Sequence, residues 1–195
     1  MSGWRCFVAV PIGDDLRERL RRAVDRWRSQ PETADLRWTD PAGWHVTLAF
    51  MGSTDPEAVP ALSNALASAV SDVRPFRVTA GGLGTFPRPS ATRVLWYRLA
   101  DADGRLADLS SRVRAAVGAS EEGDQRFQAH LTLARARNGR GTRLPAGWLD
   151  RTAGPRGRLA VDHVVLYRSH LGGRSPARYE ALASVQLGAA GGAAP

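Results

Sequence analysis

Residues 45–49 read HVTLA and residues 130–134 read HLTLA, so one short phrase occurs twice in the chain, 85 residues apart. In an extended strand, successive side chains point to opposite faces. His45 and Thr47 would therefore share one face of a first strand, and His130 and Thr132 one face of a second. The residues between them are aliphatic and would face a core. Two such strands facing each other would form a two-histidine site.

The spacing of the two phrases also indicates the architecture. Helical and strand-like patterns alternate along the chain in roughly the same order around each copy, which suggests a duplicated lobe. The sequence therefore predicts an α+β fold with two lobes related by a pseudo-twofold axis and a cleft between them. We expect one domain over residues 1–187, loops over 81–90 and 138–158, and a disordered Gly- and Ala-rich tail over 188–195.

Composition narrows the class of protein. The chain has 195 residues, of which 43% are hydrophobic, and this fits one globular domain with a sizeable core. The formal net charge is +8, and every basic residue is arginine because the sequence contains no lysine. The planar guanidinium matches phosphate oxygens, so an acidic partner is compatible with this charge. A GC-biased genome would give the same excess of arginine, so the charge by itself does not identify a substrate.

The single cysteine, Cys6, excludes an intramolecular disulfide and a cysteine metal cluster. The apolar run over residues 6–12 is too short for a signal peptide, and no segment approaches the length of a membrane span. We therefore expect a soluble, cytoplasmic protein that does not associate with membranes, and we expect it to be monomeric.

Two histidines and two threonines on facing strands suit the cleavage of a phosphodiester. Histidine titrates near neutral pH and can give or take a proton. In-line attack on phosphorus requires a base and an acid on opposite sides, and hydroxyl groups can donate to the phosphate oxygens. No carboxylates stand at metal-ligand spacing, so no metal is expected. The residues also allow a simpler interpretation, in which both histidines are half-buried strand residues bonded to neighbouring polar groups.

The chain resembles the two-histidine (2H) phosphoesterases, and among them the RNA 2′,3′-cyclic phosphodiesterases of the LigT type. The resemblance runs in the family's order through RCFVAVPI, WHVTLAFMG, RVLWYRL, RFQAHLTLARAR and VVLYRSHLGGRSPARYEAL. The family usually has proline before the second histidine, whereas this chain has Ala129. Proline would fix the backbone at the start of the strand, and its loss removes no reacting group.

The resemblance implies a fold of antiparallel sheets with helices on their outer faces. It implies hydrolysis of a 2′,3′-cyclic phosphate end, on RNA or a nucleotide, to a 2′-phosphate, with neither metal nor cofactor. His45 would be the general acid on the 3′ oxygen, His130 the general base on water, and Thr47 and Thr132 would bind phosphate. The residues alone do not distinguish the acid from the base, because the two phrases are nearly equivalent.

Arg135 and Phe50 follow the two phrases and are further candidates for substrate binding. Strict alternation places each of them with the aliphatic residues of its own strand, away from the histidine. An end of the strand or a bulge at this point would let Arg135 reach phosphate, and the resemblance implies a role at this position. For Phe50, core packing is the default, and base stacking at the edge of the cleft is the alternative.

Two other functions fit the same residues. The substrate could be a 2′,5′-linked oligonucleotide or another cyclic nucleotide, since the reacting groups would be identical. Alternatively, the chain could be a non-catalytic RNA-binding module that uses its arginines, with salt-dependent binding that is indifferent to loss of either histidine.

Overall fold

The computed structural model of this chain describes residues 3–119, 127–152, 154–170 and 177–188. Apart from Gly188, the tail expected over residues 188–195 lies outside these residues. No helix within them is long and apolar enough to cross a membrane.

The described residues form a single antiparallel sheet flanked by helices. The strands are β1 (Trp4–Pro11), β2 (Leu36–Trp38), β3 (His45–Thr54), β4 (Phe76–Phe86), β5 (Val94–Ala100), β6 (His130–Ala136), β7 (Gly157–Val161), β8 (His163–His170) and β9 (Arg178–Gln186). The α-helices are α1 (Asp14–Arg28), α2 (Val59–Val70), α3 (Arg105–Val117) and α4 (Trp148–Arg151). Short 3₁₀ turns connect several of them.

The sheet consists of two halves that meet at the histidine strands. Its order is β7-β4-β5-β6-β3-β1-β8-β9, with β2 added beside β6. Four strands lie on each side of the β6–β3 junction, where Val46 pairs with Leu131. The expected two-lobed α+β fold is therefore confirmed, with the two lobes joined edge to edge.

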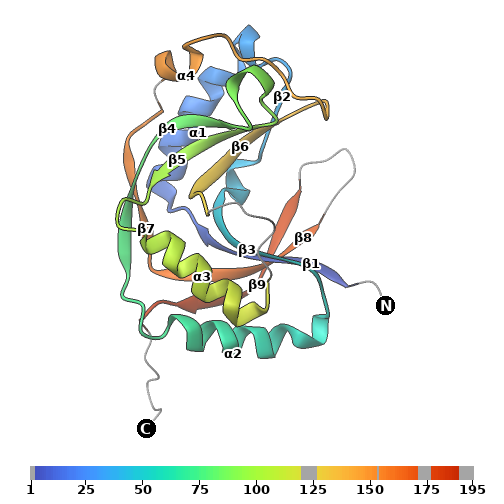
Figure 1. Ribbon diagram of the computed structural model, residues 1–195, viewed down its shortest axis with the longest axis vertical. Helices are drawn as coiled ribbons and strands as arrows, with labels where there is room; N and C mark the ends of the chain where they lie inside the picture. The colour runs from blue at the N-terminus through green and yellow to red at the C-terminus, as the bar shows by residue number, and fades with distance from the viewer. Residues whose placement is uncertain (1–2, 120–126, 153, 171–176, 189–195) are drawn as a thin grey trace.

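The helices cover the two halves separately. Figure 1 shows α1 and α4 beside the half that contains β4 and β7, and α2 and α3 beside the half that contains β3 and β9. Helix α1 follows β1 in sequence but contacts β7 of the opposite half, and α3 follows β5 but contacts β3. Each half of the sheet is thus covered by a helix that starts from the other half, which ties the lobes together.

Helix α1 illustrates why the helices lie where they do. Its buried residues Leu16, Leu20, Val24 and Trp27 recur at helical spacing and form one stripe. Asp14 and Asp15 stand in the first turn and arginines in the last turn, which complements the helix dipole.

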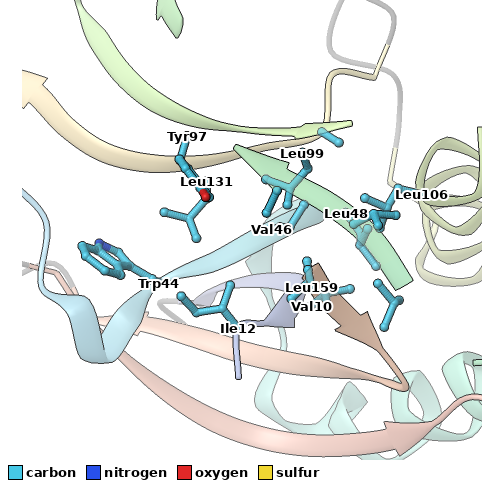
Figure 2. Packing of buried hydrophobic residues seen from close by; sticks show 14 of the residues in the cluster. Val10, Ile12, Trp44, Val46, Leu48, Tyr97, Leu99, Leu106, Leu131 and Leu159 are labelled. Atoms are coloured by element: carbon cyan, nitrogen blue, oxygen red, sulfur yellow. The ribbon is translucent and has the colours of Figure 1, made fainter. Parts of the chain in front are cut away.

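The core lies behind the histidine strands. Val46 and Leu131 are fully buried, and Figure 2 shows them among Val10, Tyr97 and Leu159 from three further strands. The two histidine strands thus pack their aliphatic residues against one shared core, as period-two alternation predicts for their first residues.

The predictions of loops over residues 81–90 and 138–158 were partly wrong. Residues 81–86 continue β4, because a register shift between Ala80 and Leu83 absorbs Gly81 and Gly82 without ending the pairing with β5. The stretch 138–158 contains α4 and the first residues of β7. Glycine-rich composition suggested irregular structure in both places, but pairing with neighbouring strands continues β4 and starts β7, and residues 148–151 form a short helix.

Candidate active site

The first histidine strand, β3, contains a β-bulge directly after its histidine and threonine. Adjacent residues of β1 pair with Thr47 and Ala49, so Leu48 is an extra residue with no partner of its own. An extra residue reverses which side chains face which side from that point on. Phe50 consequently lies on the same face as His45, and its ring is 56% exposed.

The second histidine strand, β6, contains the same bulge at the same place. Adjacent residues of β5 pair with Thr132 and Ala134, and Leu133 is the extra residue. Arg135 is therefore brought to the face of His130. The burial of the two strands agrees with this. In both, the first and third residues are half-buried, the second, fourth and fifth are buried, and the sixth is exposed.

These bulges correct the expectation from strict alternation. Phe50 and Arg135 were expected to face away from the histidines, and the structure places both on the histidine face. All six candidate residues therefore lie on one face of the sheet: His45, Thr47, Phe50, His130, Thr132 and Arg135.

The carbonyl of the extra residue in each bulge accepts a hydrogen bond from a hydroxyl group that lies on neither of the two paired strands. Ser110 of α3 is fully buried, and its hydroxyl donates to the carbonyl of Leu48 at 2.7 Å. The carbonyl of Leu133 accepts from the backbone N–H of Thr39 at 2.8 Å and from its hydroxyl at 2.9 Å. Sequence inspection did not select either residue, because each is far in sequence from the bulge that it supports.

Thr39 also connects the two halves of the site. Its hydroxyl accepts a hydrogen bond from the indole Nε1–H of Trp44 at 2.9 Å. Trp44 directly precedes His45, whereas Leu133 follows Thr132 of the other motif. One hydroxyl therefore links the backbone of the second motif to the residue that precedes the first.

Both imidazole rings are oriented by the same kind of hydrogen bond. The Nδ1 atom of His45 lies 2.6 Å from the carbonyl oxygen of Gly43, and Nδ1 of His130 lies 2.8 Å from the carbonyl oxygen of Gln128. A carbonyl oxygen only accepts, so Nδ1 carries the proton in each ring. Nε2 of each neutral ring is then left with a lone pair, as a group that takes or gives a proton requires.

Aromatic rings surround each imidazole. The ring of His45 lies 4.8 Å from that of Phe7 and 5.1 Å, edge-on, from that of Tyr179. The ring of His130 lies 5.0 Å, edge-on, from that of Phe86 and 6.1 Å from that of Trp96. These rings pack against the flanks of each imidazole and help to bury it.

The surroundings favour neutral rings in the free protein. Burial lowers the pKa of His45 to about 4; the Gly43 carbonyl opposes this shift, and the charges of His130 and Arg135 add to it. Burial also lowers the pKa of His130, again with a contribution from Arg135. Arg135 thus acts on both imidazoles electrostatically, in keeping with its place on the histidine face.

Within the described residues, no group of three or more His, Cys, Asp or Glu side chains is arranged to hold a metal ion. The two imidazoles and the Arg135 guanidinium are ionisable groups on the histidine face of the described sheet.

Known proteins are similar to this chain in sequence and in fold. The family model named LigT like Phosphoesterase matches residues 10–96, which include the first motif. A Geobacillus stearothermophilus protein named RNA 2′,3′-cyclic phosphodiesterase is 29% identical over 184 residues, covering 93% of this chain and 56% of its own length. A protein of the same name from Archaeoglobus fulgidus is 28% identical over 134 residues, covering 68% of this chain and 73% of its own length. This chain thus spans little more than half of the Geobacillus relative.

Solved structures agree over nearly the whole chain. The protein TT0787 of Thermus thermophilus has a TM-score of 0.75 and 25% identity, covering 94% of this chain and 98% of its own. Escherichia coli LigT, in a complex with 3′-AMP, has a TM-score of 0.71 and 24% identity, covering 95% and 98%. With the duplicated histidine strands and the two-lobed sheet, these matches show that the chain is similar in sequence to the LigT-like phosphoesterases over residues 10–96 and has the fold of E. coli LigT over nearly its whole length.

Proposed function

We propose that this chain is a metal-independent RNA 2′,3′-cyclic phosphodiesterase that opens a cyclic phosphate end to a 2′-phosphate. The observation that carries the proposal is the pair of equivalent bulged strands, each with a half-buried histidine whose Nδ1 is bonded to a carbonyl. The relatives from Geobacillus and Archaeoglobus carry this name, and they supply the class of substrate.

The proposed chemistry is an in-line displacement at phosphorus. His130 Nε2 takes a proton from water as the water oxygen bonds to phosphorus. The bond from phosphorus to the 3′ oxygen breaks, and protonated His45 gives its Nε2 proton to that oxygen. The product has a 2′-phosphate and a free 3′-hydroxyl, and a proton exchange between the rings and solvent restores the starting state.

The negative charge of the phosphate would allow His45 to be protonated at neutral pH, as the proposed step requires. In the free protein, the low pKa of His45 keeps its ring neutral at neutral pH. A bound phosphodiester anion between the rings would raise both pKa values, because it favours the charged form of each imidazole. The choice of His45 as acid and His130 as base rests on the family resemblance, since the two half-sites offer the same groups.

The other four candidates would bind substrate. Thr47 and Thr132 would donate to the non-bridging phosphate oxygens, and the Arg135 guanidinium would neutralise charge that develops on them. The exposed ring of Phe50 would stack on a base. We expect Phe50→Ala to raise KM while leaving stability unchanged, because the ring is mostly exposed.

The test uses a short RNA ending in a 2′,3′-cyclic phosphate, in the presence of EDTA. We expect the wild type to yield a 2′-phosphate end, and His45→Ala and His130→Ala each to lower kcat by about 10²- to 10⁴-fold. His163→Ala is the matched control, because His163, at the start of β8, bonds to the preceding residue Asp162 and should not affect turnover.

Other results would favour the competing functions. A wild type that cleaves only 2′,5′-linked RNA would change the substrate but retain the site. Salt-dependent RNA binding with no turnover, equal in wild type and both histidine variants, would favour a non-catalytic binding module. A monomeric state and a cytoplasmic location remain predictions, and sedimentation of the purified chain would check the first of them.

A further inference from the structure

A pocket of about 280 Å³ opens beside His45. Its walls combine cationic, aromatic and backbone groups, a mixture that suits a nucleotide. Its lining includes Arg17 from α1, Asp40 and Trp44 from the turn before β3, Tyr167 from β8, and Arg178 and Tyr179 from β9.

Two hydrogen bonds hold the Arg17 guanidinium in place. One terminal nitrogen of its guanidinium donates to the carbonyl oxygen of Ile12 at 2.5 Å, and the other donates to Asp14. A guanidinium has five N–H donors, so these two bonds leave three without a partner among the residues that the structure describes. The Nε–H is one of them, and it is buried with no hydrogen-bond acceptor in the described structure. The arginine is therefore rigidly placed but incompletely satisfied.

The charge around the pocket is positive. Arg17 and Arg178 border it, and Asp40 is the acidic side chain among its lining residues. The carboxylate of Asp40 already accepts the backbone N–H of Ala42 at 2.9 Å, so part of its capacity is used in its own turn. With His45 neutral, the lining carries two cations and one anion, while Asp14, which pairs with Arg17, lies outside the lining. An anionic group placed in the pocket would therefore be favoured.

The pocket lies on the His45 side of the pseudo-twofold axis. The position opposite Thr47 is Ala9, whereas the equivalent position opposite Thr132 is Trp96. The Trp96 indole therefore lies beside His130 where the other half has only a methyl group. The site is chemically symmetric at its histidines but not in the space beside them.

We propose that this pocket is a subsite for a second phosphate of the substrate, the 5′-phosphate of the nucleotide whose cyclic phosphate is opened, with Arg17 and Arg178 as its partners. The proposal rests on the proposed function and names its substrate class more closely. An RNA end or a 5′-phosphorylated nucleotide carries this group, whereas a nucleoside 2′,3′-cyclic phosphate lacks it. The rings of Tyr167 and Tyr179 line the pocket at 6.1 and 5.1 Å from the His45 ring and would cover the sugar.

The activity test compares two substrates that differ by one phosphate: cytidine 2′,3′-cyclic phosphate and its 5′-phosphorylated form. We expect wild-type kcat/KM to favour the 5′-phosphorylated substrate by about tenfold or more, as charge-assisted hydrogen bonds to one phosphate allow. Arg17→Gln should bring this ratio close to one. Arg22→Gln, which removes the same charge from the exposed side of α1, should keep the ratio.

A wild-type ratio near one would overturn the proposal, and so would a wild-type ratio retained by Arg17→Gln. Because Arg17 also anchors α1 to Ile12, folding of this variant is checked by circular dichroism. If it does not fold, Arg178→Gln replaces it, since Arg178 is exposed at the start of β9. This variant must lower the ratio several-fold, and an unchanged ratio refutes the subsite.

A binding measurement separates this proposal from the proposed function. Calorimetry compares adenosine 2′-phosphate with adenosine 2′,5′-bisphosphate, and neither ligand needs to be turned over. Tighter binding of the bisphosphate, lost in Arg17→Gln, supports the subsite even if no cyclic phosphate is hydrolysed. If both cyclic substrates are hydrolysed but the two ligands bind equally, the subsite fails and the proposed function stands.

Discussion

Replacing Thr39 by valine tests whether one hydroxyl holds the two half-sites together. The substitution keeps the branched shape of the side chain and removes the oxygen that accepts from Trp44 Nε1 and donates to the carbonyls of Leu133 and Thr132. The carbonyl of Leu133 keeps the backbone N–H of Thr39 at 2.8 Å, so most of the cost falls on Trp44.

The loss in the free energy of unfolding expected for Thr39→Val follows from the burial of the Trp44 indole. Trp44 is only 3% exposed, so its Nε1–H would find no water to replace the lost acceptor. Leaving a buried donor unsatisfied costs about 1–3 kcal/mol. At roughly 2–4 °C per kcal/mol for a chain of this size, a loss of about 2 kcal/mol lowers Tm by roughly 4–8 °C.

The assay is urea unfolding of a double-mutant cycle with Trp44→Phe, which removes the donor instead of the acceptor. If the hydrogen bond carries the effect, Thr39→Val costs about 1–2 kcal/mol less in the Trp44→Phe background than in the wild type. Thr39→Ser keeps the hydroxyl and should stay close to wild type. Equal costs of Thr39→Val in both backgrounds would refute the proposed link, as would a cost below about 0.5 kcal/mol in the wild type.

Three further predictions concern the same region. The pKa of His45 is about 4 in the folded protein against an ordinary value of 6.5, so folding favours the neutral ring. The stability that the neutral ring gives is present above pH 6.5 and is lost as pH falls from 6.5 towards 4. Urea unfolding at pH 7 and pH 4.5 should therefore show a smaller drop for His45→Gln than for wild type, and NMR titration of the His45 ring should give a midpoint well below 6. Ser110→Ala leaves the buried carbonyl of Leu48 without its 2.7 Å donor and should cost about 1–3 kcal/mol in urea unfolding, whereas an unchanged midpoint would show that the bulge needs no such support. Gly84→Ala should cost about 1–3 kcal/mol, because a Cβ at this position would lie 2.2 Å from the Trp96 ring; a Tm equal to wild type would mean that the indole moves aside freely.

The sequence was sufficient to predict the parts of the site that depend on local alternation. His45 and Thr47 share one face, and Val46 lies in the core, because these residues precede the bulge and follow the period of two. The prediction failed after Leu48, since an extra residue cannot be read from alternation. What supports that residue is the hydroxyl of Ser110, which lies 62 positions away in sequence. Only the three-dimensional arrangement brings it to the strand.

The repeated phrase nevertheless contained a usable signal. In both copies, histidine, threonine and alanine occupy the same places, so a departure from alternation in one strand should recur in the other. The structure shows this: Leu48 and Leu133 are both extra residues, and both are followed by a buried alanine. Similar sequence in two strands therefore predicts that their irregularities match, even where it cannot predict the irregularity itself.

The repeated bulge also explains how a nearly symmetric site could act on an asymmetric substrate. The same backbone device presents an aromatic ring at Phe50 in one half and a cation at Arg135 in the other. The positions opposite the two histidines differ as well, with Pro11 facing His45 and Arg98 facing His130. In the proposed reaction, the histidines and threonines would supply equivalent groups on both sides of phosphorus, so they would not by themselves choose which oxygen leaves. We therefore expect the residues that break the symmetry to fix the direction in which the substrate lies, and with it which histidine acts as the acid.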